Sequence, residues 1–129
     1  MNRVRVGTIG RIVVLALVAV AGSMILHSQS SQISPEDAQA YLRKGAQVID
    51  VRTPEEFSTG HLPNAINIPL ALIESGSPLP LKDKKQVLLL HCRSGVRSAK
   101  AAKLLSGLGY INVFDLGSYS RAAQILAGK

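Results

Sequence analysis

The feature that most constrains this fold is the uninterrupted apolar run Val87-Leu88-Leu89-Leu90, which is followed directly by His91-Cys92. Four consecutive apolar residues after a turn-rich segment are typical of a β-strand that is covered on both faces. A parallel sheet with helices on both sides provides such cover. The run therefore predicts the central strand of an α/β domain.

Short strands alternate with helical patterns along the rest of the chain. Further strands are predicted at residues 47–51, 65–68 and 112–116. Cap residues and apolar positions three and four apart predict helices, and these begin at Ser34, Thr53, Leu70, Val96 and Ser118. This alternation predicts a parallel sheet between two layers of helices.

Residues 1–26 are predicted to be an export segment. Three arginines precede the uncharged apolar run 12–26, which is the layout of a secretory signal. A helix of that length would span roughly 22 Å, short of the roughly 30 Å core of a bilayer. We expect a signal peptide cleaved after Ala21, with a short membrane anchor formed by residues 12–26 as the alternative.

The remaining chain is predicted to contain a tether at 27–32 and one domain at 33–129, located in the periplasm or another extracytoplasmic compartment. Three of the fifteen basic residues precede Ala21, so cleavage would lower the net charge from +7 to +4. The lysines at 82, 84 and 85 form a run without aromatic residues, which is typical of a solvated turn. We expect a monomer that binds no nucleic acid and contacts a membrane only through an uncleaved N-terminal segment.

Cys92 is the single cysteine of the chain, so composition alone would assign it to core packing. Its position indicates another role, because open α/β sheets bind ligands where a strand ends and a helix begins. Amide groups and the helix dipole at such a junction favour an anion and lower the pKa of a thiol. Cys92 is therefore predicted to be a nucleophile beside an anion site, and Gly95 supplies the permissive backbone of a tight loop.

Three ordered motifs resemble the rhodanese family of sulfurtransferases. The first is the loop Cys92-Arg93-Ser94-Gly95-Val96-Arg97-Ser98, which is similar to the active-site loop of that family. The other two are the segments 49–57 and 60–69, with the sequences IDVRTPEEF and GHLPNAINIP. The resemblance covers residues 33–126, and it implies a single rhodanese-like domain with a five-stranded parallel sheet and helices on both faces.

The resemblance also implies a reaction. Cys92 would be the catalytic residue, attacking the sulfane sulfur of thiosulfate or of a persulfide and releasing a group such as sulfite. Cyanide or an external thiol would then accept the sulfur. The implied substrate-binding residues are Arg93, Ser94, Gly95, Val96, Arg97 and Ser98, and neither a metal nor another cofactor is expected.

Two alternatives remain open from the sequence. Protein tyrosine phosphatases have five residues between cysteine and arginine, whereas four separate Cys92 from Arg97, which favours sulfur transfer over phosphatase or arsenate reductase chemistry. The second alternative is a non-enzymatic module that carries sulfur or binds a protein partner.

Four further residues are predicted to form the framework around the site. Asp50 and Arg52 lie at a strand end, where a charge pair would hold the following loop. His61 and His91 are expected to be hydrogen-bonded framework residues, because a thiol that is already ionised needs no base. Tyr119 stands near the position of a tryptophan in many rhodaneses and is expected to replace its packing.

Overall fold

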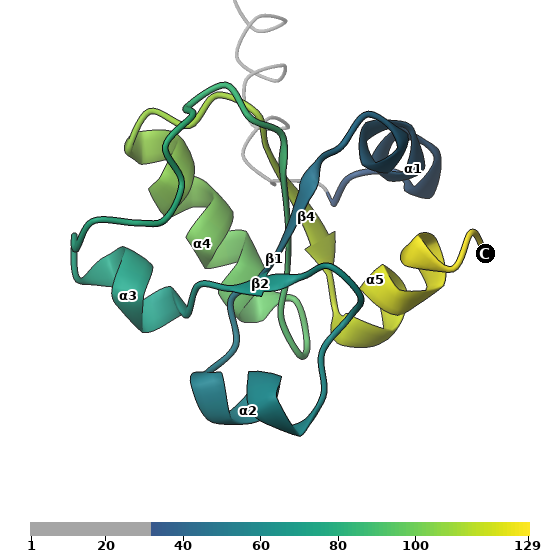
Figure 1. Cartoon of the computed structure of the whole chain (residues 1–129), viewed down its shortest axis with the longest axis horizontal. Helices are drawn as coiled ribbons and strands as arrows, with labels where there is room; N and C mark the ends of the chain where they lie inside the picture. The colour runs from purple at the N-terminus through teal and green to yellow at the C-terminus, as the bar shows by residue number, and fades with distance from the viewer. Residues whose placement is uncertain (1–31) are drawn as a thin grey trace, which may run out of the picture. The chain divides into compact units, whose positions relative to one another are not determined.

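Four parallel strands form the sheet of the domain in the computed structural model, which describes residues 32–129 (Figure 1). The order across the sheet is β2-β1-β3-β4. The bounds are Gln47–Asp50 for β1, Ile66–Asn67 for β2, Leu88–His91 for β3 and Val113–Gly117 for β4. The predicted central position of β3 is confirmed, because β1 and β4 pair with its two sides.

The number of strands corrects one expectation. The resemblance implied five strands, but residues 32–129 form four, at the positions that the apolar runs predicted. At the outer edge of β4, the Ile33 amide donates one backbone hydrogen bond to Asp115 (3.0 Å). Ser34 then caps a helix that begins at Pro35. Because proline has no N–H and fixes φ, no further ladder bond can form at this step.

Helices cover both faces of the sheet, as predicted. Helices α3 (Leu70–Glu74) and α4 (Val96–Gly107) lie on one face, and α1 (Pro35–Arg43) and α5 (Tyr119–Leu126) lie on the other (Figure 1). The short helix α2 (Pro54–Thr59) follows β1 at the carboxyl ends of the strands. Right-handed crossover connections between parallel strands produce this layered arrangement.

Hydroxyl side chains start three of these helices. The Ser34 hydroxyl accepts a hydrogen bond from the Asp37 amide (3.1 Å), and Thr53 and Glu56 form the predicted reciprocal capping box. Ser118 caps α5 in the same way. Helix α4 differs, because it follows Gly95 and has no side-chain cap. Its first amide groups are therefore open to another acceptor.

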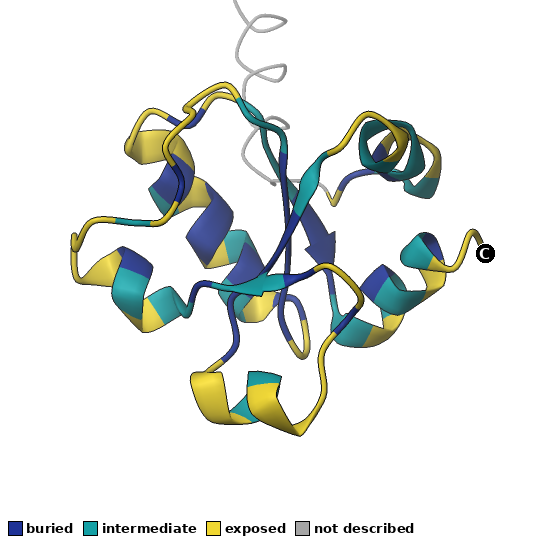
Figure 2. Cartoon of the chain, in the orientation of Figure 1, coloured by how far each residue is buried: buried dark blue, intermediate teal, exposed yellow. Residues whose placement is uncertain are grey.

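The core has two parts, one on each face of the sheet. Alternate strand residues point to opposite faces, so Leu88 and Leu90 pack toward α4 whereas Leu89 packs toward α1 and α5. Figure 2 shows that β3 is buried along its whole length and that most of β1 and β4 is buried, whereas β2, at the edge of the sheet, is partly exposed. Each leucine removed from water in this way contributes about 2 kcal/mol. The sheet is thus a rigid platform for the loops at its carboxyl edge.

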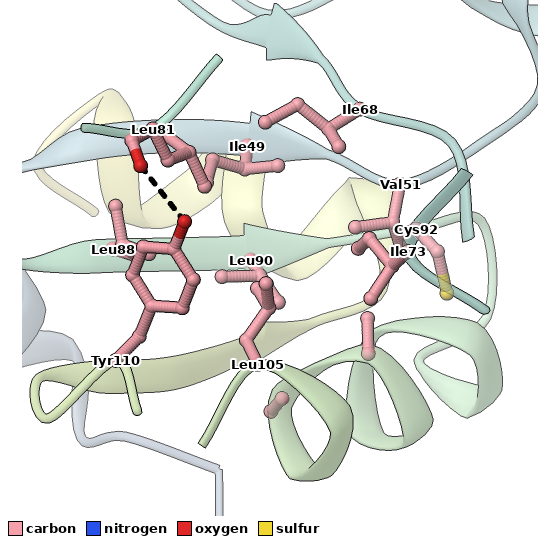
Figure 3. Packing of buried hydrophobic residues seen from close by; sticks show 12 residues of the cluster. Ile49, Val51, Ile68, Ile73, Leu81, Leu88, Leu90, Cys92, Leu105 and Tyr110 are labelled. Atoms are coloured by element: carbon pink, nitrogen blue, oxygen red, sulfur yellow. Dashed lines mark hydrogen bonds between the residues drawn. The ribbon is translucent and has the colours of Figure 1, made fainter. Parts of the chain in front are cut away.

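Figure 3 shows that the core on the α4 side reaches the carboxyl end of β3. At one end the Tyr110 hydroxyl donates a hydrogen bond to the Leu81 carbonyl (2.8 Å). At the other end Cys92 follows Val51 and Ile73 as the last member of the same buried cluster. The thiol is consequently positioned by core packing as well as by its loop.

The predictions for the N-terminal segment lie outside the described residues. The export segment 1–26 and residues 27–31 of the tether are not described by the structure. The export segment, its cleavage and the tether therefore stay predictions. No helix within residues 32–129 combines the length and the apolar composition required to cross a bilayer.

Candidate active site

The loop after β3 carries Cys92 and is fixed to the neighbouring strand. The Cys92 amide donates a hydrogen bond to the Gly117 carbonyl, and the Tyr119 amide donates one to the Arg93 carbonyl, both at 3.2 Å. The β3–β4 register shifts at this point, since Leu90 pairs with Asp115 but His91 pairs with Gly117. Such irregularities bend a strand and change the direction of the chain at its end. Here the shift turns the loop toward the start of α4.

The sulfur of Cys92 lies in a cradle of hydrogen-bond donors. The Gly95 amide donates to Cys92 Sγ at 3.0 Å. Burial raises the pKa of the Cys92 thiol, but hydrogen bonds from the amides of Ser94, Gly95 and Ser98 and from the Ser98 hydroxyl outweigh it, so the pKa lies below its ordinary value. The thiol therefore ionises more readily than an ordinary cysteine although the residue is fully buried.

Ser98 connects this cradle to β4. Its buried hydroxyl is 3.1 Å from the Gly95 carbonyl oxygen and 3.4 Å from the Gly117 carbonyl oxygen. A hydroxyl has a single proton, so it can donate to one of these carbonyls or to the sulfur at any moment. Rotation of the hydroxyl can therefore follow the charge on Cys92 without movement of the helix.

Two glycines allow the backbones of the loop and of β4 to approach each other. Gly95 and Gly117 have φ values of +97° and +87°, in the left-handed region that favours glycine. A Cβ on Gly95 would lie 3.4 Å from Gly117 Cα, and a Cβ on Gly117 would collide with the Gln32 side chain. The contact at Gly95 is an ordinary one and the Gln32 side chain is exposed, so the positive φ values are the main reason that these two positions favour glycine.

Arg97 is engaged by a carboxylate from another helix. Its Nη1 and Nη2 atoms lie 2.6 Å and 3.0 Å from the two carboxylate oxygens of Glu56 in α2. This hydrogen bonding lowers the pKa of Glu56 to about 2, and it is the largest cause of the raised pKa of Arg97, to which the nearby Cys92 sulfur also contributes. The pair links α2 to α4 beside the thiol.

The other predicted loop residues face the solvent. Arg93 and Ser94 are exposed, and the Val96 side chain is 74% exposed. Arg93 lies on the wall of an open hollow of about 450 Å³, whose other lining residues are Arg52, Glu56, Thr59, Tyr119 and Ser120. The hollow adjoins the site through Glu56, the partner of Arg97, whereas Cys92 itself does not line it. The structure thus brings Cys92, Gly95, Arg97 and Ser98 together and leaves Ser94 and Val96 at the rim.

Asp50 and Arg52 form the predicted charge pair, which is buried at the end of β1. Arg52 Nη2 lies 2.7 Å from Asp50 Oδ2, and the same nitrogen donates to the Gly60 carbonyl at 2.8 Å. The hydrogen bond to Asp50 is the largest cause of the raised pKa of Arg52. The guanidinium carbon lies 4.8 Å from the ring centre of Tyr119. This pair ties β1 to the end of α2 and to the base of α5.

Both histidines occupy framework positions. His61 stacks on Phe57 at 4.1 Å and its Nδ1 lies 3.0 Å from the Leu62 carbonyl oxygen. His91 packs edge-on against Tyr119, which supports the expected packing role of that tyrosine. Burial lowers the pKa of His91, and its Nε2 atom has no hydrogen-bond partner within residues 32–129. Its side chain faces away from the thiol, as expected for adjacent strand residues.

The contact of Glu56 with Arg97 was not predicted from the sequence. Its part in the capping box with Thr53 already accounted for the residue, and no local pattern indicates a partner 41 positions away. No cluster of three potential metal ligands exists within the part of the chain that the structure describes. The site thus consists of a thiol, amide donors and paired charges.

The fold and the site together define a class of α/β proteins. In this class a cysteine with a lowered pKa follows a buried parallel strand and lies in the amide cradle at the start of a helix. Such a cradle stabilises a thiolate, and it offers the same donors to a sulfur anion bound to that thiol.

Comparison with known proteins identifies the family. The model of the rhodanese-like domain family matches residues 34–122. The thiosulfate sulfurtransferase PspE of Escherichia coli is 36% identical over 76 residues, covering 59% of this chain and 73% of that protein. The chloroplastic thiosulfate sulfurtransferase 16 of Arabidopsis thaliana is 37% identical over 105 residues, covering 73% and 88%.

A solved structure agrees with these relatives. The human single-domain sulfurtransferase TSTD1 superposes with a TM-score of 0.64 at 25% identity, covering 74% of this chain and 97% of that one. The chain belongs to the rhodanese-like domain family. The three relatives described above carry the name sulfurtransferase.

Proposed function

We propose that the protein transfers a sulfane sulfur from thiosulfate or a persulfide donor, through a persulfide on Cys92, to cyanide or a thiol. The observation that carries this proposal is the hydrogen bond from the Gly95 amide to Cys92 Sγ, together with the lowered pKa of that thiol. A thiolate is the form that attacks sulfur. The names of the relatives support thiosulfate as the donor.

The first half of the cycle forms a sulfur–sulfur bond on the protein. The Cys92 thiolate attacks the outer sulfur of thiosulfate and forms a bond to it. The bond between the two sulfurs of thiosulfate breaks, and its electron pair leaves with sulfite. The negative charge then lies on the terminal sulfur of the persulfide. Amides of the loop and of the first turn of α4 stabilise that charge without rearranging.

The second half returns the thiolate. Cyanide or a thiolate attacks the terminal sulfur, and the electron pair of the persulfide bond returns to Cys92. The product is thiocyanate or an external persulfide. Since Cys92 is the sole cysteine of the chain, no internal thiol can resolve the persulfide, and the acceptor must come from outside.

Full burial of Cys92 adds a requirement to this cycle. A donor can reach the sulfur only when the side chains that cover it move, and the opening beside these side chains is called the mouth of the site below. Arg97 lies near the Cys92 sulfur, which contributes to its raised pKa, and Glu56 is paired with Arg97 at 2.6 Å, so we expect a donor to meet this ion pair as it approaches the thiol. The mouth rather than the cradle is therefore expected to limit which donors react.

Thiocyanate formation from thiosulfate and cyanide tests the proposal. We expect turnover by the wild-type protein and none by Cys92→Ser, because a serine hydroxyl is not ionised at neutral pH and cannot hold the sulfur. Equal activity in both proteins would refute the role of Cys92. Absence of activity in both, together with capture of a specific protein partner, would support a binding module. Turnover of an aryl phosphate without any persulfide would support phosphatase chemistry.

A further inference from the structure

One edge of Arg97 that could bind an anionic donor is occupied by the protein itself. The two terminal nitrogens of Arg97 are 2.6 Å and 3.0 Å from the two oxygens of Glu56. This parallel arrangement is the one in which a guanidinium binds a carboxylate, a phosphate or another oxyanion with two hydrogen bonds. An oxyanion can use this edge only by displacing Glu56.

The charges around the mouth are largely compensated. Arg52 is neutralised by Asp50 at 2.7 Å, and Arg97 by Glu56 at 2.6 Å. Arg93 is exposed and forms no ion pair within residues 32–129. A donor that enters the hollow therefore meets one uncompensated cation, and it also meets the carboxylate of Glu56 on the lining.

The charge on Glu56 is permanent under assay conditions. The hydrogen bonds from Arg97 lower its pKa to about 2. The carboxylate therefore stays ionised at every pH at which a thiolate can react, and a change in pH does not release Arg97. Only a competing anion or a substitution can do so.

We infer that Glu56 determines donor specificity: its carboxylate competes with the anionic group of the donor for Arg97, so that the site discriminates against donors with two negative charges. This inference rests on the proposed function and names a selectivity of the same site. Donors with a single negative charge lose less binding free energy, because Glu56 repels them less and because they depend less on Arg97. Glu56 is thus a specificity residue and takes no part in bond making.

Thiosulfate and methanethiosulfonate provide a matched pair of donors. Both carry a terminal sulfane sulfur, but thiosulfate has two negative charges and methanethiosulfonate has one. Attack by Cys92 on either donor forms the same persulfide. The bond to the departing group breaks in each case, and its electron pair leaves with sulfite or with methanesulfinate. A difference between the donors therefore reports on binding of the departing group.

The decisive variant is Glu56→Gln. Glutamine at the third position of α2 maintains the capping box with Thr53, so the helix start is retained while the negative charge is lost. We expect the ratio of kcat/KM for thiosulfate to that for methanethiosulfonate to rise about fivefold, through a lower KM for thiosulfate. Glu56→Asp, whose shorter side chain cannot reach both nitrogens, should raise the ratio in the same direction by less.

Two further proteins control for general charge effects. Glu36→Gln removes one negative charge at an exposed position in the first turn of α1, on the other face of the sheet, and it should leave the donor ratio unchanged. The double variant Glu56→Gln with Arg97→Met should lose the gain seen in Glu56→Gln, because that gain requires the released guanidinium. Thermal melts of all variants establish that they are folded.

The outcomes separate this inference from the proposed function. If the wild-type protein forms a persulfide with neither donor, the proposed function fails. If it reacts with both donors but the ratio is the same in wild type and Glu56→Gln, only the specificity role fails. A higher KM for thiosulfate in Glu56→Gln would also overturn it, since Glu56 would then be holding Arg97 in place for the substrate.

Discussion

Two opposing effects act on the thiol of Cys92. Burial favours the neutral form, whereas three amides and the Ser98 hydroxyl favour the anion and prevail. The dominance of hydrogen bonding explains how the pKa of a fully buried cysteine can lie below its ordinary value, as the proposed role of Cys92 requires. It also makes the pKa of Cys92 depend on backbone amides of the loop as well as on a side chain.

The substitution Ser98→Ala tests this dependence. Loss of the hydroxyl removes a donor to the thiolate, so the pKa of Cys92 should rise. The inflection in alkylation rate by iodoacetamide should then move to higher pH. At neutral pH the rate should fall by roughly a factor of ten. Ser106→Ala, at an exposed position of the same helix, should leave the profile unchanged, and an unshifted inflection in Ser98→Ala would contradict the account.

Local patterns in the sequence, an apolar strand before Cys92 and a helix start after it, were sufficient to predict the junction at which the thiol lies. They did not predict the long-range contacts around it. The contact between Glu56 and Arg97 joins residues 41 positions apart, and the packing of Gln32 against Gly117 spans a longer interval. Such pairs depend on how α2 and β4 are placed, which local patterns do not encode.

Among the elements, β1 and α2 are joined by the ion pair between Asp50 and Arg52. Asp50 is completely buried, and four hydrogen bonds from Arg52 satisfy its carboxylate. Burial of a charge is tolerated only with such partners. The pair therefore determines how the chain leaves the sheet on the way to Glu56.

Arg52→Met should destabilise the domain strongly, because it leaves the buried carboxylate of Asp50 without its guanidinium. We expect a loss of about 3 kcal/mol in the free energy of unfolding, measured by urea denaturation at neutral pH. Arg43→Met provides the control, since Arg43 is exposed at the end of α1. A loss in Arg52→Met no larger than in the control would show that the pair does not fix β1 to α2.

The elements themselves were largely predictable. Cap residues located the starts of α1, α2 and α5, and apolar runs located all four strands within one or two residues. The expectation of a fifth strand came from the resemblance and was wrong for residues 32–129. The cause is local, because Pro35 turns the chain into α1 after one bond to β4.

For the whole molecule, we propose export from the cytoplasm with removal of residues 1–21. Intact-mass measurement of the protein recovered from its native cells tests this: the expected mass corresponds to a chain that starts at Gly22 in the periplasmic or other extracytoplasmic fraction. A full-length chain in the membrane fraction would contradict cleavage and support an anchor at residues 12–26. A full-length chain in the cytoplasm would refute export.

Intact-mass spectrometry of the purified protein after incubation with thiosulfate shows whether Cys92 carries sulfur. We expect a mass increase of one sulfur atom in the wild-type protein, which disappears when cyanide is added. The increase should be absent in Cys92→Ser. A wild-type protein that gains no sulfur from any sulfane donor, or a Cys92→Ser protein that gains it equally, would contradict the account.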